Sequence, residues 1–213
     1  RPVINLMNYG DHGKYCITLL TILFSIAPIT IFQYYIRNET GTLTNVNNPG
    51  EIRQLPLTRY YEISDYYIDK ANYFRLIDSH TYKSTLTLTS WFAIPLKNDT
   101  AAVENNIWYC SRYSDKTEDG LFSDKAEIIK WKDKVIPGHV LNMSDDVTHK
   151  RAVYFKRITK SEAYDNYMET IDNKLVNKSP IFLEPEYESY EEKTSGLLEW
   201  SLGTFLFFNI FLS

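Results

Sequence analysis

Apolar residues are concentrated in two stretches near the two ends of the chain. Residues 15–36 form a run of 22 residues without a charge, and residues 197–213 contain a single charged residue, Glu199. A helix needs about 20 apolar residues to cross the hydrocarbon core of a bilayer. The pattern therefore predicts a transmembrane helix over 15–36 and a second one over 197–213, which is short and ends inside its apolar run, as a truncated span would.

Aromatic and acidic residues near the ends of these stretches are the expected membrane-interface positions. The predicted interface residues are Tyr15, Tyr34, Tyr35, Glu199 and Trp200. An alternative for 15–36 is a helix buried in a protein core, and a cleaved signal peptide is a lesser one, because its apolar region has only about 7–15 residues. For 197–213 the alternative is an amphipathic or core helix.

Between the two stretches the pattern changes to short runs rich in Tyr, Ile and Thr. Over residues 82–89, Leu86 and Leu88 alternate with threonines, and this period of two predicts a half-buried strand. The strand continues through an apolar segment, and we expect Pro95 to end it. Further strands are predicted over 60–63, 66–68, 73–77, 107–113, 151–158 and 180–183, with turns at 78–81 and 97–100.

Two helices are predicted in the second half of this middle region. The first covers 125–134 and is ended by Pro137 and Gly138. The second covers 160–175 and begins at a capping box formed by Thr159 and Glu162. Its apolar residues recur at helical spacing: Tyr164, Tyr167, Met168, Ile171 and Leu175. The expected fold class is α+β, an antiparallel sheet of about four to six strands with both helices packed on one face, flanked by the N-terminal and C-terminal transmembrane helices.

These elements divide the chain into six segments. They are a polar lead-in (1–14), the first transmembrane helix (15–36), a linker rich in Asn and Thr (37–50), an extramembrane α+β domain (51–183), an acidic juxtamembrane segment (184–196) and the second transmembrane helix (197–213). Two spans place both termini on one side of the membrane. Positive charges near the first span are almost balanced, and we expect the domain on the extracytoplasmic side of the cell or inner membrane.

The charge distribution argues against one class of partner. The net charge is −4, and residues 37–196 carry all of it, since +1 before them offsets −1 after them. A mildly acidic domain lacks the basic face that nucleic-acid binding usually needs. We therefore expect no nucleic acid among the partners.

Patterns that would indicate catalysis or metal binding are weak. The four histidines, His12, His80, His139 and His149, have no metal-ligand spacing and are interpreted as surface or loop residues. Asp145 and Asp146 with His149 form only a weak metal-binding pattern. Cys110 lies inside a predicted strand and is interpreted as a small buried residue rather than a nucleophile. The sequence thus predicts no catalytic residue, no metal and no cofactor.

Tyrosines and glutamates supply the candidate partner-binding surface. The predicted contact residues are Tyr60, Tyr61, Tyr66, Tyr67, Glu186, Glu188, Glu191 and Glu192. The alternative interpretation is sheet packing for the tyrosines and the start of a helix for the glutamates. The sequence favours a non-enzymatic integral membrane protein, surrounded by lipid, whose domain contacts another protein or a second copy. The alternatives are a membrane-anchored enzyme with a site of dispersed Asp, Glu and His residues, and a fragment of a larger multispan protein.

Overall fold

The computed structural model describes residues 15, 19, 26, 29–30, 33, 41–83, 85–99, 106–118, 125–160, 162–171, 179–190 and 203. The chain divides into two units, one made of residues 42–189 and the other of residues 1–41 and 190–213. The described residues of the second unit are mostly helical, and Thr30 donates a hydrogen bond from its hydroxyl to the Ile26 carbonyl (2.9 Å). The fold described below is that of residues 42–189.

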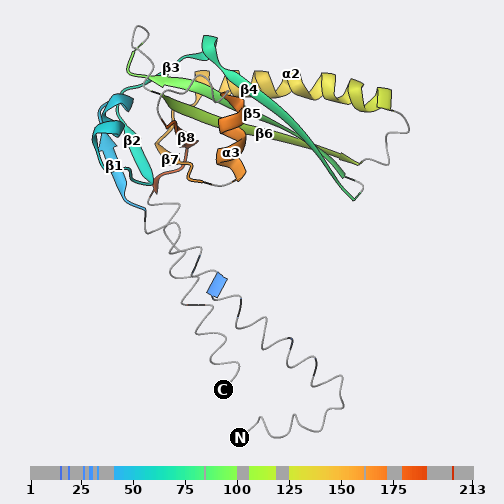
Figure 1. Ribbon diagram of the computed structural model, residues 1–213, viewed down its shortest axis with the longest axis horizontal. Coiled ribbons are helices and arrows are strands. Elements are labelled where there is room, and N and C mark those ends of the chain that lie inside the picture. The colour runs from blue at the N-terminus through green and yellow to red at the C-terminus, as the bar shows by residue number, and fades with distance from the viewer. Residues whose placement is uncertain are drawn as a thin grey trace, which may run out of the picture. The chain divides into compact units, whose positions relative to one another are not determined.

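A mixed sheet of eight strands organises this unit (Figure 1). Its strands are β1 (Leu43–Val46), β2 (Tyr60–Ile63), β3 (Tyr67–Ile68), β4 (Phe74–Tyr82), β5 (Thr85–Lys97), β6 (Ile107–Glu118), β7 (Tyr154–Arg157) and β8 (Ile181–Glu186). The order is β1-β2-β7-β8-β6-β5-β3, and β4 also pairs with β5. Two helices, α2 (Lys125–His149) and α3 (Glu162–Thr170), and two short 3-10 helices, η2 (Pro49–Gln54) and η3 (Lys70–Asn72), complete it.

The predicted α+β class is confirmed, but the predicted antiparallel sheet is wrong. β1 pairs with β2 and β6 pairs with β8 in parallel, while the other pairs are antiparallel. A parallel pair needs a crossover connection, and the chain between β6 and β8 includes α2, β7 and α3. Sequence patterns identified individual strands but not which distant strands are neighbours, so the predicted strand count of four to six is also too low.

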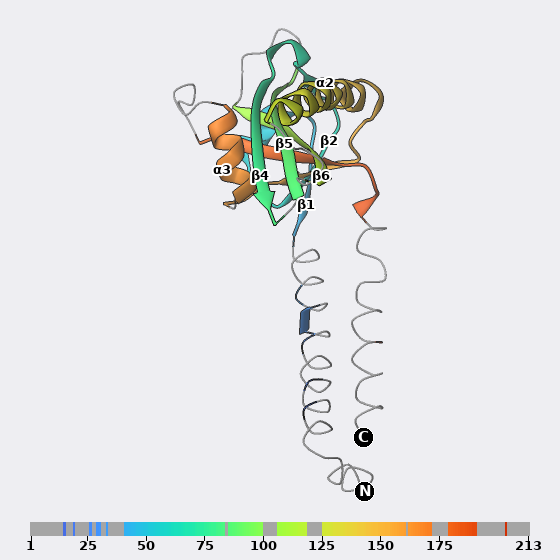
Figure 2. The same cartoon turned by 90° about the vertical axis from the view of Figure 1, so that its right-hand side faces the viewer.

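The two helices cover opposite faces of the sheet, so the prediction that both pack on one face is wrong. Successive side chains of a strand point to opposite faces. On β5, Ser90 contacts His139 of α2, whereas its neighbour Trp91 packs against Tyr167 of α3 with ring centroids 5.2 Å apart. Figure 2 shows α2 and α3 on the two sides of β4 and β5.

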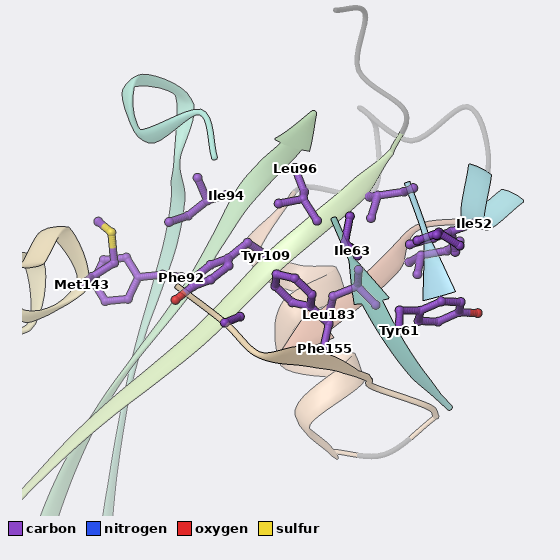
Figure 3. Packing of buried hydrophobic residues seen from close by; sticks show 14 residues of the cluster. Ile52, Tyr61, Ile63, Phe92, Ile94, Leu96, Tyr109, Met143, Phe155 and Leu183 are labelled. Atoms are coloured by element: carbon purple, nitrogen blue, oxygen red, sulfur yellow. The ribbon is translucent and has the colours of Figure 1, made fainter. Parts of the chain in front are cut away.

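The larger core lies on the α2 face of the sheet (Figure 3). Strands from across the sheet contribute Phe92, Ile94, Tyr109, Phe155 and Leu183, and further members are Ile52 of η2 and Met143 of α2. Several aromatic rings meet edge to face, as Tyr109 and Phe155 do with centroids 6.4 Å apart. Because burying one large apolar side chain contributes about 1.5–3 kcal/mol, this cluster is the main source of stability.

The smaller core lies under α3 and bears out much of the predicted helix pattern. Tyr167 and Ile171 are buried, Tyr164 and Met168 are partly buried beside them, and Leu175 lies outside the described residues. They pack against Trp91, Ala93, Trp108, Cys110 and Phe182. The expected contacts with Leu86, Leu88 and Ile107 are not found in this cluster, because those three side chains point to the other face.

Helix α2 runs through the proline that was expected to stop it. It extends over 25 residues to His149 and contains Pro137. A proline inside a helix removes one hydrogen bond to the carbonyl four residues earlier. Pro137 lies on the exposed side of α2, while His139 and Met143 of the following turns are buried against the sheet. Packing of that second half outweighs the lost bond.

Two predicted breaks in the strands are also misplaced. β5 continues through Pro95, whose carbonyl accepts a hydrogen bond from the Asp69 amide (3.0 Å). The nitrogen of Pro95, which has no hydrogen to donate, is therefore on the side where β5 changes its partner from β4 to β3. Few hydrogen bonds between strands are lost at this point. The turn predicted at 78–81 is part of β4 instead, and the chain reverses one step later at Lys83, which has a φ of 54°.

The prediction of an integral membrane protein with an extracytoplasmic domain is contradicted. Among the residues that the structure describes, no helix combines the length and the apolar character that crossing a bilayer requires. Helix α2 has 25 residues but carries charged side chains along its length. The ranges predicted as spans, 15–36 and 197–213, lie mostly outside the described residues, as do Tyr34, Tyr35, Glu199 and Trp200, while Tyr15 is helical and exposed.

Replacing Ile171 by Asp should unfold residues 42–189. Ile171 has no exposed surface in the cluster under α3, and burying an unpaired carboxylate there costs several kcal/mol. The matched control is Ile129→Asp, the same exchange at an exposed position of α2, which should change the melting temperature little. Circular dichroism melting compares the two, and equal melting temperatures would show that the α3 packing is wrong.

The ion pair between Asp69 and Lys97 should make stability depend on pH. Hydrogen bonds from Lys97 (2.8 Å) and Asn72 (2.9 Å) lower the pKa of the Asp69 carboxyl below its ordinary value. A lowered folded-state pKa stabilises the fold above the unfolded value of about 3.9, and this stabilisation is lost as the pH falls through the folded value. Asp69→Asn should therefore destabilise the protein at pH 7 and cost progressively less below about pH 4 in urea titrations. Asp133→Asn, at an exposed position of α2, is the control without such a trend.

Candidate functional site

The residues predicted to bind a partner do not form one surface. Tyr60 and Tyr61 of β2 are buried, with 4% and 0% of their surface exposed, so they offer no contact area. Tyr66 is half-buried and its hydroxyl accepts a hydrogen bond from the Ala152 amide (3.2 Å). Tyr67 is exposed on β3, Glu186 ends β8, and Glu188 is exposed just after it. Glu191 and Glu192 lie outside the described residues.

A serine, a histidine and an aspartate are hydrogen-bonded in series between β5, α2 and β6. The Ser90 hydroxyl is 2.8 Å from Nδ1 of His139, and Nε2 of His139 is 2.9 Å from a carboxylate oxygen of Asp115. Since a carboxylate can only accept, a neutral imidazole donates from Nε2 and accepts the Ser90 proton at Nδ1. Leu88 and Asp115 are directly opposite across β5 and β6, which places the carboxylate on the α2 face.

This series resembles the set of groups in a hydrolase, but its orientation does not suit catalysis. A nucleophilic serine must reach the substrate, with its base beside it. Here Ser90 has 0% and His139 2% of their surface exposed, whereas the Asp115 side chain is 58% exposed. The reactive end of the series is closed and the carboxylate end is open. The geometry therefore supports a structural role, in which the two hydrogen bonds of His139 fix α2 on the sheet.

The interpretation of His139 as a surface residue is wrong for an identifiable reason. Val135, His139 and Met143 recur at intervals of four residues, which places them along one stripe of a helix. That stripe is visible only if the helix continues past Pro137. His80 and His149, by contrast, are exposed as predicted, and His12 lies outside the described residues.

The other groups considered for chemistry have structural partners. At the end of α2, His149 contacts Asp145 (2.8 Å) and Lys150 contacts Asp146 (2.7 Å), each four residues apart. Among the described residues no three His, Cys, Asp or Glu side chains come close enough to hold a metal ion. Cys110 is buried, as predicted, and burial raises the pKa of its thiol well above the ordinary value, so the thiol is held protonated.

A cavity of about 550 Å³ opens beside the C-terminal end of β7. Three of its lining residues are cationic, namely Arg53 of η2, Arg157 of β7 and Lys160 just before α3. None of the lining residues that the structure describes is acidic. The three cations come from positions more than 100 residues apart at the extremes, and no sequence motif connects them.

The outer edge of β4 is a second accessible feature. This strand has nine residues, and β5 is its one neighbour among the described strands. From Ile77 to Tyr82 every residue of β4 is exposed. A strand at a sheet edge presents unpaired backbone amides and carbonyls, which another chain can pair with. The sequence predicted a strand here but gave no sign that it would be an edge.

Replacing His139 by Leu should destabilise the fold, because His139 links Ser90 of β5 to Asp115 of β6 by hydrogen bonds. The substitution removes two hydrogen bonds and leaves the buried Ser90 hydroxyl unpaired, with an expected cost of about 2–3 kcal/mol. Adding Ser90→Ala to His139→Leu should recover about 1 kcal/mol, because the orphaned hydroxyl is then removed.

The matched control for this prediction is His149→Leu, at an exposed site on the same helix, which should cost less than about 0.5 kcal/mol. Urea unfolding measures the free energy of unfolding of the unaltered chain and of four variants. These are His139→Leu, Ser90→Ala, the double variant and His149→Leu. If Ser90→Ala cost the same with and without His139, the two side chains would not be coupled.

No protein-family model matches the chain, and no curated protein or solved structure is significantly similar to it.

Proposed function

We propose that residues 42–189 form a non-enzymatic protein-contact domain, and that two copies of the chain join through β4. The observation that carries the proposal is the long exposed edge of β4, which has a partner on one side only among the described strands. Adding a strand to an open sheet edge is a common mode of protein recognition, in which backbone hydrogen bonds provide affinity.

The β4 edge lacks the usual protection against pairing. Edge strands are commonly kept short or carry prolines and several charges. β1, at the opposite end of the sheet, has four residues, and β3 has two. β4 has nine residues with the sequence FRLIDSHTY, which contains no proline and only Arg75 and Asp78 as fully charged residues.

A second copy is the partner that the β4 sequence fits. When two β4 strands pair antiparallel about Ser79, Asp78 lies opposite His80 of the second copy, and the reverse pair repeats it. In the same register Leu76 lies opposite Tyr82. The Asp78 carboxylate can accept a hydrogen bond from the His80 ring, and favourable cross-strand pairs stabilise a sheet by about 0.2–1 kcal/mol each. The strand thus offers one polar pair and one apolar pair, each made twice, to a second copy of itself.

An enzyme built from dispersed acidic residues and histidines has less support. The one such series among the described residues, Ser90, His139 and Asp115, has its serine buried. A catalytic site also requires a substrate position next to the reacting group. Neither the β4 edge nor its flanking residues place acid–base groups around a cavity.

Substitutions that change the charges on β4 test whether the dimer forms through this strand. His80→Asp would place two aspartates opposite each other twice in the symmetric pair, and it should weaken dimerisation by about 2 kcal/mol, or about thirtyfold. Asp78→Lys added to His80→Asp should restore affinity, because the new lysine faces the new aspartate. Sedimentation equilibrium of the 213-residue chain measures both variants. His149→Asp, an exposed exchange on α2, is the control and should leave the dimer unchanged.

Disulfide trapping checks the register in the same experiment. Ser79→Cys places the new thiol directly opposite its counterpart, with Cβ atoms about 4.5–5.5 Å apart, and mild oxidation should link the copies. Thr81→Cys is the control, because four residues of offset separate the two thiols by about 13 Å. A monomer at all concentrations, or equal linking through positions 79 and 81, would refute the proposed pairing.

A further inference from the structure

We propose that the basic cavity at the end of β7 binds an organic phosphate ester, with Arg157 and Lys160 as its main ligands. The cavity is lined by residues of η2, of the end of β7 and the segment after it, of α3, and of the segment that leads into β8. Its volume of about 550 Å³ is within the range of small-molecule sites. The proposal is independent of the β4 edge, which contributes no lining residue.

The charged residues that the structure describes around the cavity have one sign. Among its described lining residues three are cationic and none carries a carboxylate. The chain as a whole carries a net charge of −4, so three cations around one cavity contrast with its overall charge. Such a concentrated charge suits a compact, multiply charged anion better than a nucleic-acid backbone, which needs an extended basic face.

Backbone contacts hold the two arginines in place. Arg53 donates from Nη2 to the carbonyls of Ser179 (2.8 Å) and Asn106 (3.0 Å), which ties η2 to the segment before β8. Arg157 donates from Nε to the Thr58 carbonyl (2.7 Å). The bond at Nε fixes the orientation of the planar guanidinium, and its two Nη groups form a fork that matches two oxygens of a phosphate.

Arg157 and Lys160 have donor groups without an acceptor among the described residues. No described residue accepts a hydrogen bond from the Nη groups of Arg157 or from the ammonium of Lys160. Thr159 and Ser179 add hydroxyl groups. Partial burial lowers the pKa of the Arg53 guanidinium, because removal from water disfavours its charge, and a bound anion would offset that cost.

The uncharged residues that line the cavity indicate what the ligand contains besides its phosphate group. Leu57, Ile158, Pro180 and Ile181 are apolar, and Tyr164 contributes an aromatic ring. The ring of Tyr164 is held edge to face against Phe182 with centroids 5.2 Å apart. An inorganic phosphate would leave this apolar wall uncovered, whereas a phosphate ester with an aromatic or aliphatic body would cover it.

Calorimetric titration of the 213-residue chain with phenyl phosphate, inorganic phosphate and phenol tests the proposal. Phenyl phosphate should bind more tightly than inorganic phosphate, and phenol should not bind. Arg157→Gln should weaken phenyl phosphate binding by about tenfold or more, and Arg157→Lys by less, because the charge remains while the fork is lost.

Lys160→Gln keeps the test decisive if Arg157→Gln fails to fold. Lys160 is exposed and its replacement should leave the melting temperature unchanged while weakening phenyl phosphate binding severalfold. Lys116→Gln removes the same charge from an exposed position of β6 and is the matched control without effect. Absence of saturable binding up to about 10 mM phenyl phosphate, equal binding of phenol, or unchanged binding by the Arg157 and Lys160 variants would each overturn the proposal.

Discussion

Burial of β5 on both faces is the constraint on which the rest of the unit depends. Every residue from Ser90 to Leu96 on this strand is buried. A strand in this position needs an apolar cover on each side, and α2 supplies part of one and α3 part of the other. The alternation of Ser90 and Trp91 between the two helices follows directly from the pleat of the strand.

Polar contacts then determine how the covering elements are oriented. A hydrophobic cover alone is non-directional, whereas a hydrogen bond requires defined geometry. Ser90, His139 and Asp115 fix α2 at one point of its length, and Asp69 with Lys97 fixes the corner where η3 leads from β3 toward β4. Because Ser90 and His139 are buried, a series of groups that resembles a catalytic one has a structural role here.

The two candidate sites lie where the covered part of the sheet ends. Along β4, the residues beyond Leu76 are exposed, so the strand edge becomes available for pairing. At the end of β7, Arg157 lines a cavity together with Arg53 of η2 and Ser179 of the segment before β8, and this cavity is positively charged. Protein contact and anion binding would thus use separate surfaces of one rigid core.

Local sequence patterns by themselves determined most strands of this protein, the amphipathic character of α3 and the burial of Ile171, because these follow from periodicity within a few residues. Only the tertiary structure decided which strands are neighbours, that α2 continues past Pro137, and that His139 is buried. Each of these depends on packing energy between segments far apart in the chain, which outweighs local propensity. The same reason applies to the sites: Arg53, Arg157 and Lys160 meet only through the fold, and whether β4 is an edge depends on the order of the whole sheet.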